Sequence, residues 1–106
     1  MRIHKRIKNL TEPEKEQFEE YLGKKVERIS PMIKAHYPDP DTAVLDVFIE
    51  KISKRTVFKF SYTLDLPRTR PIAARGAKHT VTECMDMATA KLERGLTKHF
   101  KVLTKG

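Results

Sequence analysis

Five basic residues near the end of the chain keep a spacing that fits one face of an α-helix. They lie in TAKLERGLTKHFKVLTK, residues 89–105, and are Lys91, Arg94, Lys98, Lys101 and Lys105. Steps of three and four residues stack side chains along one face of a helix, a stride usually kept by core leucines. A row of cations has instead the chemistry to hold a polyanion such as nucleic acid.

A helical wheel separates these cations from the apolar residues of the same segment. The apolar residues fall within an arc of roughly 80°; they are Val81, Met85, Ala88, Leu92, Leu96 and Leu103. The cations occupy another arc of roughly 80°, centred about 140° away, and form a ridge about 20 Å long. Past the first turn, Asp86 and Glu93 are the only acids in the helix, so like charges repel along the ridge. We therefore expect the counter-charge to come from outside the chain.

A second basic group lies in the helix expected from residue 11 onward. Lys24, Lys25 and Arg28 lie to one side of its apolar stripe, whereas its first half is acidic. If the two helices lie side by side, their basic halves merge into one patch. We expect three cations of the first strand to extend this patch, namely Arg2, Arg6 and Lys8.

Six elements follow from capping and periodicity. Residues 2–8 alternate as a strand, and Thr11 with Glu14 forms a capping box that opens the first helix. Its apolar stripe consists of Phe18, Leu22, Val26, Ile29 and Ile33. Pro31 lies inside this stripe and is expected to end or kink the helix. The YPDPD segment, residues 37–41, is expected to be a loop.

The middle of the chain alternates with the period of β-strands. Residues 42–52 and 56–66 flank the basic turn SKR and predict a hairpin. Residues 72–78 form a weaker strand, in which Gly76 suggests a bulge or a frayed edge. Thr80 and Glu83 form a second capping box that opens the last helix.

This order, strand-helix-strand-strand-strand-helix, predicts an α+β two-layer sandwich. Strands that are apolar on one side need a cover on that side only, so both helices should pack on one face of a four-stranded sheet. The predicted core is made of Leu45, Val47, Ile49, Phe58, Phe60 and Tyr62 from the sheet and Phe18, Leu22, Val26, Met85, Leu92 and Leu96 from the helices. The 106 residues suffice for one such domain.

Composition and motifs exclude several classes of protein. The formal net charge of +8 favours a polyanionic partner, and no apolar segment is long enough to span a membrane. The start, MRIHKRIKNL, lacks the apolar stretch of a signal peptide, so we expect a cytoplasmic protein. The single cysteine, Cys84, rules out an intrachain disulfide and a cysteine-based zinc site, and its place beside the core arc predicts a buried thiol.

Nothing in the sequence predicts catalysis, a metal or a cofactor. The four histidines, which are His4, His36, His79 and His99, are scattered and form no metal-binding or triad pattern. His99 falls within the core arc of the last helix, where a packed role is expected. We therefore expect a protein that is not an enzyme.

Two helix motifs resemble those of the ribosome hibernation promoting factors, also called ribosome-associated inhibitors or sigma-54 modulation proteins. The motifs are LGKKVERI at residues 22–29 and KLERGL at residues 91–96, with Asp86 preceding the second. Lys8-Asn9-Leu10 is similar to the Arg-Asn-Leu that follows the first strand of the family. Gly95 departs from the family's Gln. The resemblance covers nearly the whole chain and includes the element order.

The resemblance implies a short-form hibernation factor with one ribosome-binding domain, residues 1–106, that is a monomer away from the ribosome. Such a protein binds the small ribosomal subunit in the channel for mRNA and tRNA and blocks translation in resting or stressed cells. The residues implied to contact ribosomal RNA phosphates are Lys24, Lys25, Arg28, Lys91, Arg94, Lys98 and Lys101.

Two other binding functions remain open from the residues alone. A generic double-stranded RNA-binding domain shares three strands followed by a basic helix, although its lysines usually lie near the start of that helix. A protein-interaction module is the second, because the sheet face with Val44, Phe48 and Val57 is apolar for a free surface. There we expect Phe48 to contact Val57 across the strands.

Overall fold

The computed structural model describes residues 1–37, 39–52 and 56–105, with the backbone alone at residues 40 and 102–105. The predicted turn at residues 53–55 therefore lies outside the described part. The elements are β1 (Arg2–Lys8), α1 (Glu12–Lys34), a 3₁₀ turn (Pro40–Thr42), β2 (Val44–Ile52), β3 (Val57–Asp65), β4 (Ile72–Lys78) and α2 (Val81–Lys105). The order matches the prediction, except that a 3₁₀ turn overlaps the end of the expected loop and continues to Thr42, which had been expected in the second strand.

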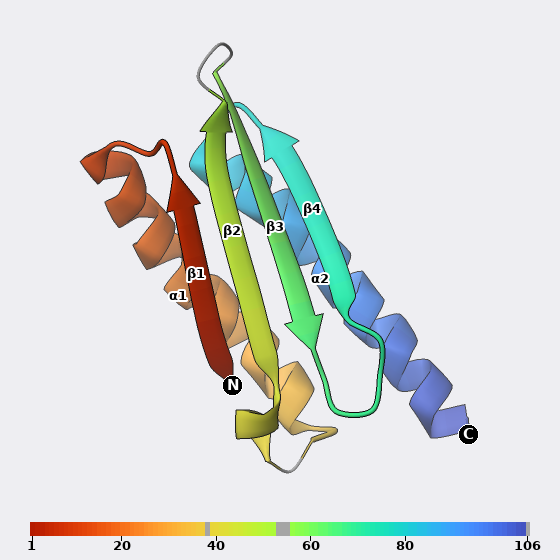
Figure 1. Ribbon diagram of the computed structural model, residues 1–106. Coiled ribbons are helices and arrows are strands. Elements are labelled where there is room, and N and C mark those ends of the chain that lie inside the picture. Colours follow the sequence, from red (N-terminus) through yellow and green to blue (C-terminus); the bar gives the residue numbers. More distant parts are fainter. Residues whose placement is uncertain (38, 53–55, 106) are drawn as a thin grey trace.

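The four strands form one mixed sheet in the order β1-β2-β3-β4. β1 runs parallel to β2, and β2, β3 and β4 form an antiparallel meander. Both helices lie behind the sheet and leave its other face uncovered (Figure 1). The predicted two-layer α+β architecture is thus confirmed. Within the described residues, neither helix is long and apolar enough to cross a membrane.

The core fills the layer between the sheet and the helices. Alternate residues of β2 and β3 point into it, so Leu45, Val47 and Ile49 are fully buried. All but one of the predicted core residues are buried. The exception is Val26, which is half-buried and packs against the rim of the core. The side chain of Leu103, also expected on the core face, lies outside the described residues.

One buried polar chain links the sheet to α2. The hydroxyl of Thr89 donates to the carbonyl of Met85 at 2.6 Å, and the Tyr62 hydroxyl lies 2.9 Å from the same Thr89 oxygen. Because the only proton of Thr89 is directed at Met85, Tyr62 donates and Thr89 accepts. Burial raises the pKa of Tyr62 to about 12, so the phenol keeps this proton at physiological pH.

Both predicted helix starts are confirmed. The Thr11 side chain accepts from the backbone of Glu14, and the Glu14 carboxylate accepts from the backbone of Thr11 at 2.9 Å. Thr80 accepts from the backbone of Glu83 at 3.1 Å. These caps fix where α1 and α2 leave their strands, and hence the position of each basic segment along the sheet.

Pro31 was expected to end or kink the first helix, and the first of these two outcomes is wrong. α1 continues through Pro31 to Lys34, and the amide of Ala35 donates to the Pro31 carbonyl at 3.1 Å. Ile29 and Ile33, on either side of the proline, are both buried and hold the last turns on the core. Pro31 has no backbone N–H, so the carbonyl four residues before it lacks its helical hydrogen bond. Because Pro31 is exposed, this carbonyl lies on the side of the helix that faces water. Tertiary packing here outweighs the local preference.

The expected bulge or frayed edge at Gly76 is also wrong. Gly76 pairs with Phe60 in an unbroken register and is buried. A Cβ at this position would lie 2.4 Å from the carbonyl oxygen of Cys84. The glycine therefore permits close contact between β4 and α2. Gly95 plays a weaker version of this role, since its Cβ would lie 3.0 Å from Cγ2 of Ile72.

Candidate nucleic-acid interface

The two helices together form a groove lined by basic side chains. Arg28 comes from α1, and Arg94, Lys98 and Lys101 come from α2; Ala90, Glu93 and Thr97 complete the lining. The four cations are exposed. The structure therefore brings together four of the seven predicted site residues, from segments more than sixty positions apart in the sequence.

An acid at the base of this groove fixes the arginine from α1. The Glu93 carboxylate receives two contacts from Arg28, at 2.8 Å from Nε and 3.1 Å from Nη2. Only the Nη2 contact is a hydrogen bond, and among the described residues the buried Oε1 of Glu93 has no hydrogen-bond partner. The ion pair thus joins the helices through one charge-assisted hydrogen bond and one close contact of opposite charges. Because the Arg28 side chain keeps 60% of its surface exposed, the pair is screened by water and open to competition from another anion.

Lys25 is held more tightly than the sequence suggested. Its amine lies 2.7 Å from the Asp86 carboxylate and 4.7 Å from the centre of the Tyr21 ring, and only 12% of its side chain is exposed. The Tyr21 hydroxyl donates to the same carboxylate. Burial alone would raise the pKa of Asp86, but these two hydrogen bonds outweigh it and lower that pKa. Lys25 therefore serves first as part of an interhelix clamp.

The remaining predicted site residues lie around the groove. Lys24 is exposed and lies 3.9 Å from Glu20, one turn earlier in α1. Lys91 is exposed too, but it lines a different hollow, beside Gly76 and Met87 at the β4 edge. The side chain of Lys105, the last member of the ridge, lies outside the described residues.

Arg2, Arg6 and Lys8 do not extend the helix surface, which corrects the prediction. They pair in register with Val44, Phe48 and Glu50, whereas Ile7 pairs with the buried Ile49. Since paired residues in a sheet share a face, the three cations lie on the face that no helix covers. The expected cross-strand contact of Phe48 with Val57 is wrong as well, because Phe48 pairs with Ser61 and Val57 with Ile52.

Sequence reasoning missed the acidic partners of the site. Asp86 and Glu93 had been considered only along their own helix, where they leave the cations unpaired. Their partners, Lys25 and Arg28, come from the other helix. The signal that could have found them is the spacing itself. Lys25 and Arg28 are three residues apart and Asp86 and Glu93 seven, so each pair lies on one side of its helix.

Neither the cysteine nor His99 lines the groove in the described part of the chain. Among the described residues, no three His, Cys, Asp or Glu side chains come together as a metal site. The Cys84 thiol is fully buried, as predicted, and burial raises its pKa to about 11. His99 is half-buried as expected, with Nε2 3.3 Å from the Tyr37 hydroxyl.

Comparison with known proteins identifies the family. The family model described as Sigma 54 modulation protein / S30EA ribosomal protein matches residues 3–103. The chain belongs to this family. The resemblance carried by the two helix motifs is thereby confirmed, and membership makes this a ribosome-associated protein. No curated protein sequence matches the chain at a significant level.

Two solved structures share its fold. The Protein Y N-terminal domain from Thermus thermophilus matches with a TM-score of 0.68 and 20% identity, over 93% of this chain and 99% of that one. A ribosomal subunit interface protein from Coxiella burnetii matches with a TM-score of 0.64 and 20% identity, over 95% of this chain and 99% of that one. At such identity the likeness concerns the fold alone.

Proposed function

We propose that this protein inhibits translation by binding ribosomal RNA of the small subunit in the channel used by mRNA and tRNA. The contact surface is the basic side of the two helices, and its residues are Lys24, Lys25, Arg28, Lys91, Arg94, Lys98 and Lys101. Family membership supports the ribosome as the partner, and the site residues rest on the resemblance and on the arrangement of charge.

The observation that carries the proposal is the groove between the helices. Its four cations, Arg28, Arg94, Lys98 and Lys101, converge from two helices, and among the described lining residues Glu93 is the one acid. A folded RNA presents phosphates from neighbouring backbones, and a rigid surface of this kind contacts them without reading sequence. The two arginines can each hold a phosphate through two hydrogen bonds.

The ion pair in the groove suggests how Arg28 takes part. In the free protein Glu93 holds the guanidinium at the groove's base. A phosphate entering the groove would compete with the Glu93 carboxylate for the exposed side of Arg28. Arg28 would then be positioned before binding and would lose little conformational freedom when RNA arrives.

A blocking factor works by occupying a site, so it needs neither a cofactor nor a metal and performs no reaction. We propose that residues 1–106 act as one ribosome-binding domain and that the protein is a monomer away from the ribosome. Ribosome association implies the cytoplasm as its compartment.

The test is cosedimentation with purified small subunits across a salt series. In the variant Lys91→Gln/Arg94→Gln/Lys98→Gln, three ridge charges are removed without adding repulsion. If all three contact phosphates, the slope of log K against log salt should fall by about 2–3, at 0.7–0.9 per contact. Inhibition of a cell-free translation reaction should be lost in parallel.

A matched variant removes the same number of charges elsewhere. Arg2→Gln/Lys15→Gln/Lys78→Gln lowers the net charge equally but lies outside the helix groove. This control should keep most of its affinity and its inhibition. Equal losses in both variants would mean that only total charge matters, and a ridge variant that still binds and inhibits would refute the site. Preference for any RNA duplex over the small subunit would favour a generic double-stranded RNA-binding domain.

A further inference from the structure

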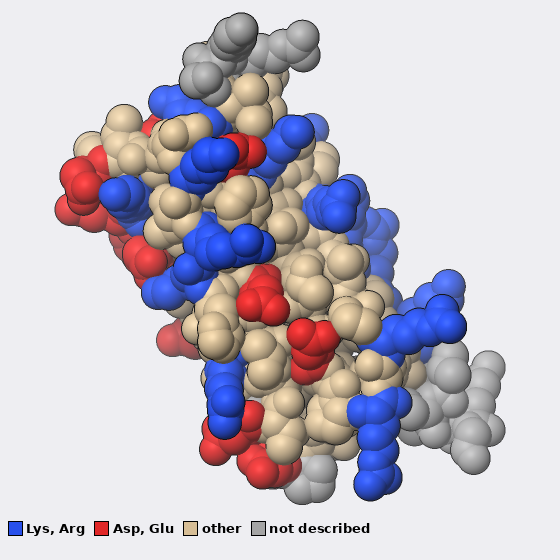
Figure 2. Space-filling view, in the orientation of Figure 1, with Lys and Arg blue, Asp and Glu red and all other residues tan. Residues whose placement is uncertain are grey.

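The uncovered face of the sheet has its own arrangement of charge and aromatic surface. One row across the four strands contains Arg6, Phe48, Ser61 and Arg75, which are paired in register. Figure 2 looks onto this face, where basic side chains crowd the upper half and acidic ones lie mainly in the middle and along one margin. This face is opposite the helix groove.

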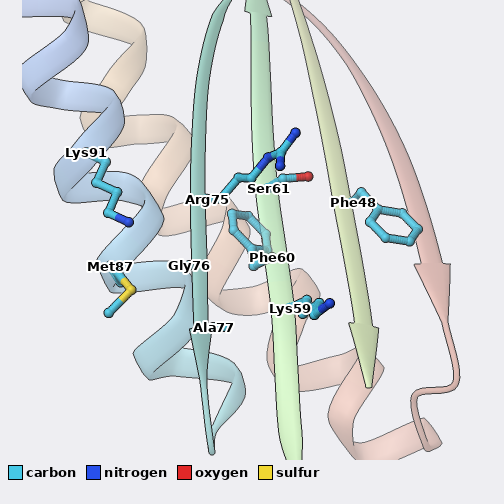
Figure 3. A pocket seen from close by; sticks show the side chains of 9 residues that line it. All are labelled: Phe48, Lys59, Phe60, Ser61, Arg75, Gly76, Ala77, Met87 and Lys91. Carbon is cyan, nitrogen blue, oxygen red and sulfur yellow. The ribbon is translucent and has the colours of Figure 1, made fainter. Parts of the chain in front are cut away.

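Phe48 lies at the centre of that row and is accessible. Its ring is half-exposed, and the Arg6 guanidinium lies over it, 5.1 Å from the ring centre. On the other side, the small Ser61 separates Phe48 from Arg75, and the three residues with Lys59 line a hollow. In Figure 3 Arg75, Ser61, Lys59 and Phe48 extend to the side of the sheet away from α2, whereas Lys91 lies on the α2 side.

The charge around Phe48 is in excess. Arg6, Lys59 and Arg75 form no ion pair with any described residue, although Arg6 contacts the Phe48 ring. Glu50, the acid in the neighbouring row, is already paired with Lys8 at 3.4 Å.

Among the described residues, this face has two more acids: Asp46 lies in the row on the other side of Phe48, and Asp65 one row further toward the start of β2. Glu50 is also the cross-strand neighbour of Lys59. Four cations, which are Arg6, Lys8, Lys59 and Arg75, thus share the rows around Phe48 with two carboxylates, so positive charge is in excess there.

We propose that this face binds single-stranded RNA, with one base stacked on the Phe48–Arg6 pair and the adjoining phosphates held by Lys59 and Arg75. Aromatic rings and guanidinium planes are the surfaces on which unpaired bases stack, and nearby cations neutralise the backbone. A duplex does not fit this arrangement, because its bases are already stacked on one another. A protein partner fits less well, since the charged ring around Phe48 interrupts the apolar surface that an interface core needs.

This inference goes beyond the proposed function and does not depend on it. The helix groove would hold folded ribosomal RNA, whereas the sheet face would take an unpaired strand on the opposite side. With both sites occupied, the domain would lie between two RNA segments. Either site could fail in experiment while the other remains.

The experiment is fluorescence anisotropy of a fluorescein-labelled ten-nucleotide polyuridine RNA at low salt. Phe48→Leu keeps an apolar side chain on the sheet but removes the stacking ring, and it should weaken binding by about tenfold. Lys59→Gln/Arg75→Gln should weaken binding and lower the salt slope by about 1.4–1.8, at roughly 0.7–0.9 per contact. Val57→Ala, which alters an apolar residue of the same face outside the hollow, should bind as the unmodified protein does.

A groove variant, Arg94→Gln/Lys98→Gln, separates the two sites; it leaves Lys91 unchanged, because Lys91 lines the same hollow as Phe48. It should keep binding to the oligonucleotide that depends on Phe48, while binding the small subunit more weakly. The proposal is overturned if the unmodified protein does not bind the oligonucleotide, or if Phe48→Leu binds it equally well. It is also overturned if the groove variant alone abolishes binding to the oligonucleotide, or if that variant binds a duplex of the same length as tightly as the single strand. Circular dichroism of each variant confirms that it is folded.

Discussion

Gly76 and Gly23 offer the same substitution with opposite expected outcomes. At Gly76 an added methyl group would lie 2.4 Å from the Cys84 carbonyl oxygen, 3.1 Å from Cβ of Met87 and 3.2 Å from the Ala88 nitrogen. Two of these atoms belong to the backbone of α2, so no side-chain rotation can relieve the contact. At Gly23, in the exposed middle of α1, nothing lies within 4 Å of the new methyl group.

The distances set the magnitude for Gly76→Ala. Real Cβ contacts are essentially never shorter than 3.0 Å, so α2 must move away from β4 by at least the difference between 3.0 and 2.4 Å. A gap of about 0.5–1 Å between packed surfaces removes a quarter to a half of their van der Waals contact energy. Overpacking typically lowers the free energy of unfolding by about 1–3 kcal/mol. Alanine also has less backbone freedom than glycine in the unfolded chain, which raises the free energy of unfolding by about 0.4–1 kcal/mol. We expect a net loss of about 1–2 kcal/mol.

Gly23→Ala should stabilise the protein by about 1 kcal/mol, because alanine is the better helix former and nothing obstructs it. Thermal unfolding, monitored by circular dichroism, measures the stability of both variants. The Tm of Gly76→Ala should fall by roughly 4–16 °C, and that of Gly23→Ala should rise by roughly 4–8 °C. A Gly76→Ala variant as stable as the unmodified protein would refute the close-packing argument. A Tm that falls equally in both variants would show that the effect is not specific to the strand–helix contact.

Three further predictions concern single side chains. The Cys84 thiol, whose pKa burial raises to about 11, should not react with a disulfide reagent at pH 8 in the folded protein, and should react at once in urea. The pKa of Asp86 is lower in the folded protein than in the unfolded chain. Its contacts with Lys25 and Tyr21 therefore stabilise the fold at a pH above the ordinary pKa of about 3.9, and this stabilisation is lost as the pH falls through the lower pKa of the folded state. The Tm advantage over Asp86→Asn should therefore be constant from pH 5 to 7 and shrink below about pH 4; an advantage that grows there would contradict the clamp. Glu93→Gln removes the acid from the groove and should tighten small-subunit binding severalfold in cosedimentation. Weaker binding would mean that Glu93 contributes more by holding Arg28 in place than it costs by competing with phosphate for it.

Local sequence patterns were enough to predict the helices, the strands and their arrangement in two layers. The strict alternation of β2 and β3 identified the buried side chains of the sheet, and the threonine–glutamate caps placed both helix starts. These signals are carried by residues within four positions of each other, so one sequence contains them in full. Pro31 was misjudged because the packing that carries α1 past it comes from the core, which a local rule does not contain.

The candidate site was predictable as a set of cations but not as a geometry. Helical spacing identified the α2 ridge, and the groove then joined Arg28 to it. Spacing also places Lys25 and Arg28 on one side of α1 and Asp86 and Glu93 on one side of α2. Which cation meets which acid depends on how the helices pack, and the contact of Lys25 with Asp86 spans sixty-one positions. Arg2, Arg6 and Lys8 were assigned to the wrong side although their alternation with Ile7 already separates them from the apolar face that the helices cover.

The sheet ends on both sides in strands that are unsuited to joining another sheet. β1 carries four cations in seven residues and β4 carries two, so neither edge is a flat apolar template. Lysine and arginine on an edge strand discourage pairing with a second chain, through repulsion between like charges. High ionic strength would weaken that protection, because the Debye length falls to about 3 Å at 1 M salt. The same charge thus keeps copies of the protein apart, and salt that would weaken the proposed binding to RNA should leave the protein more prone to aggregate.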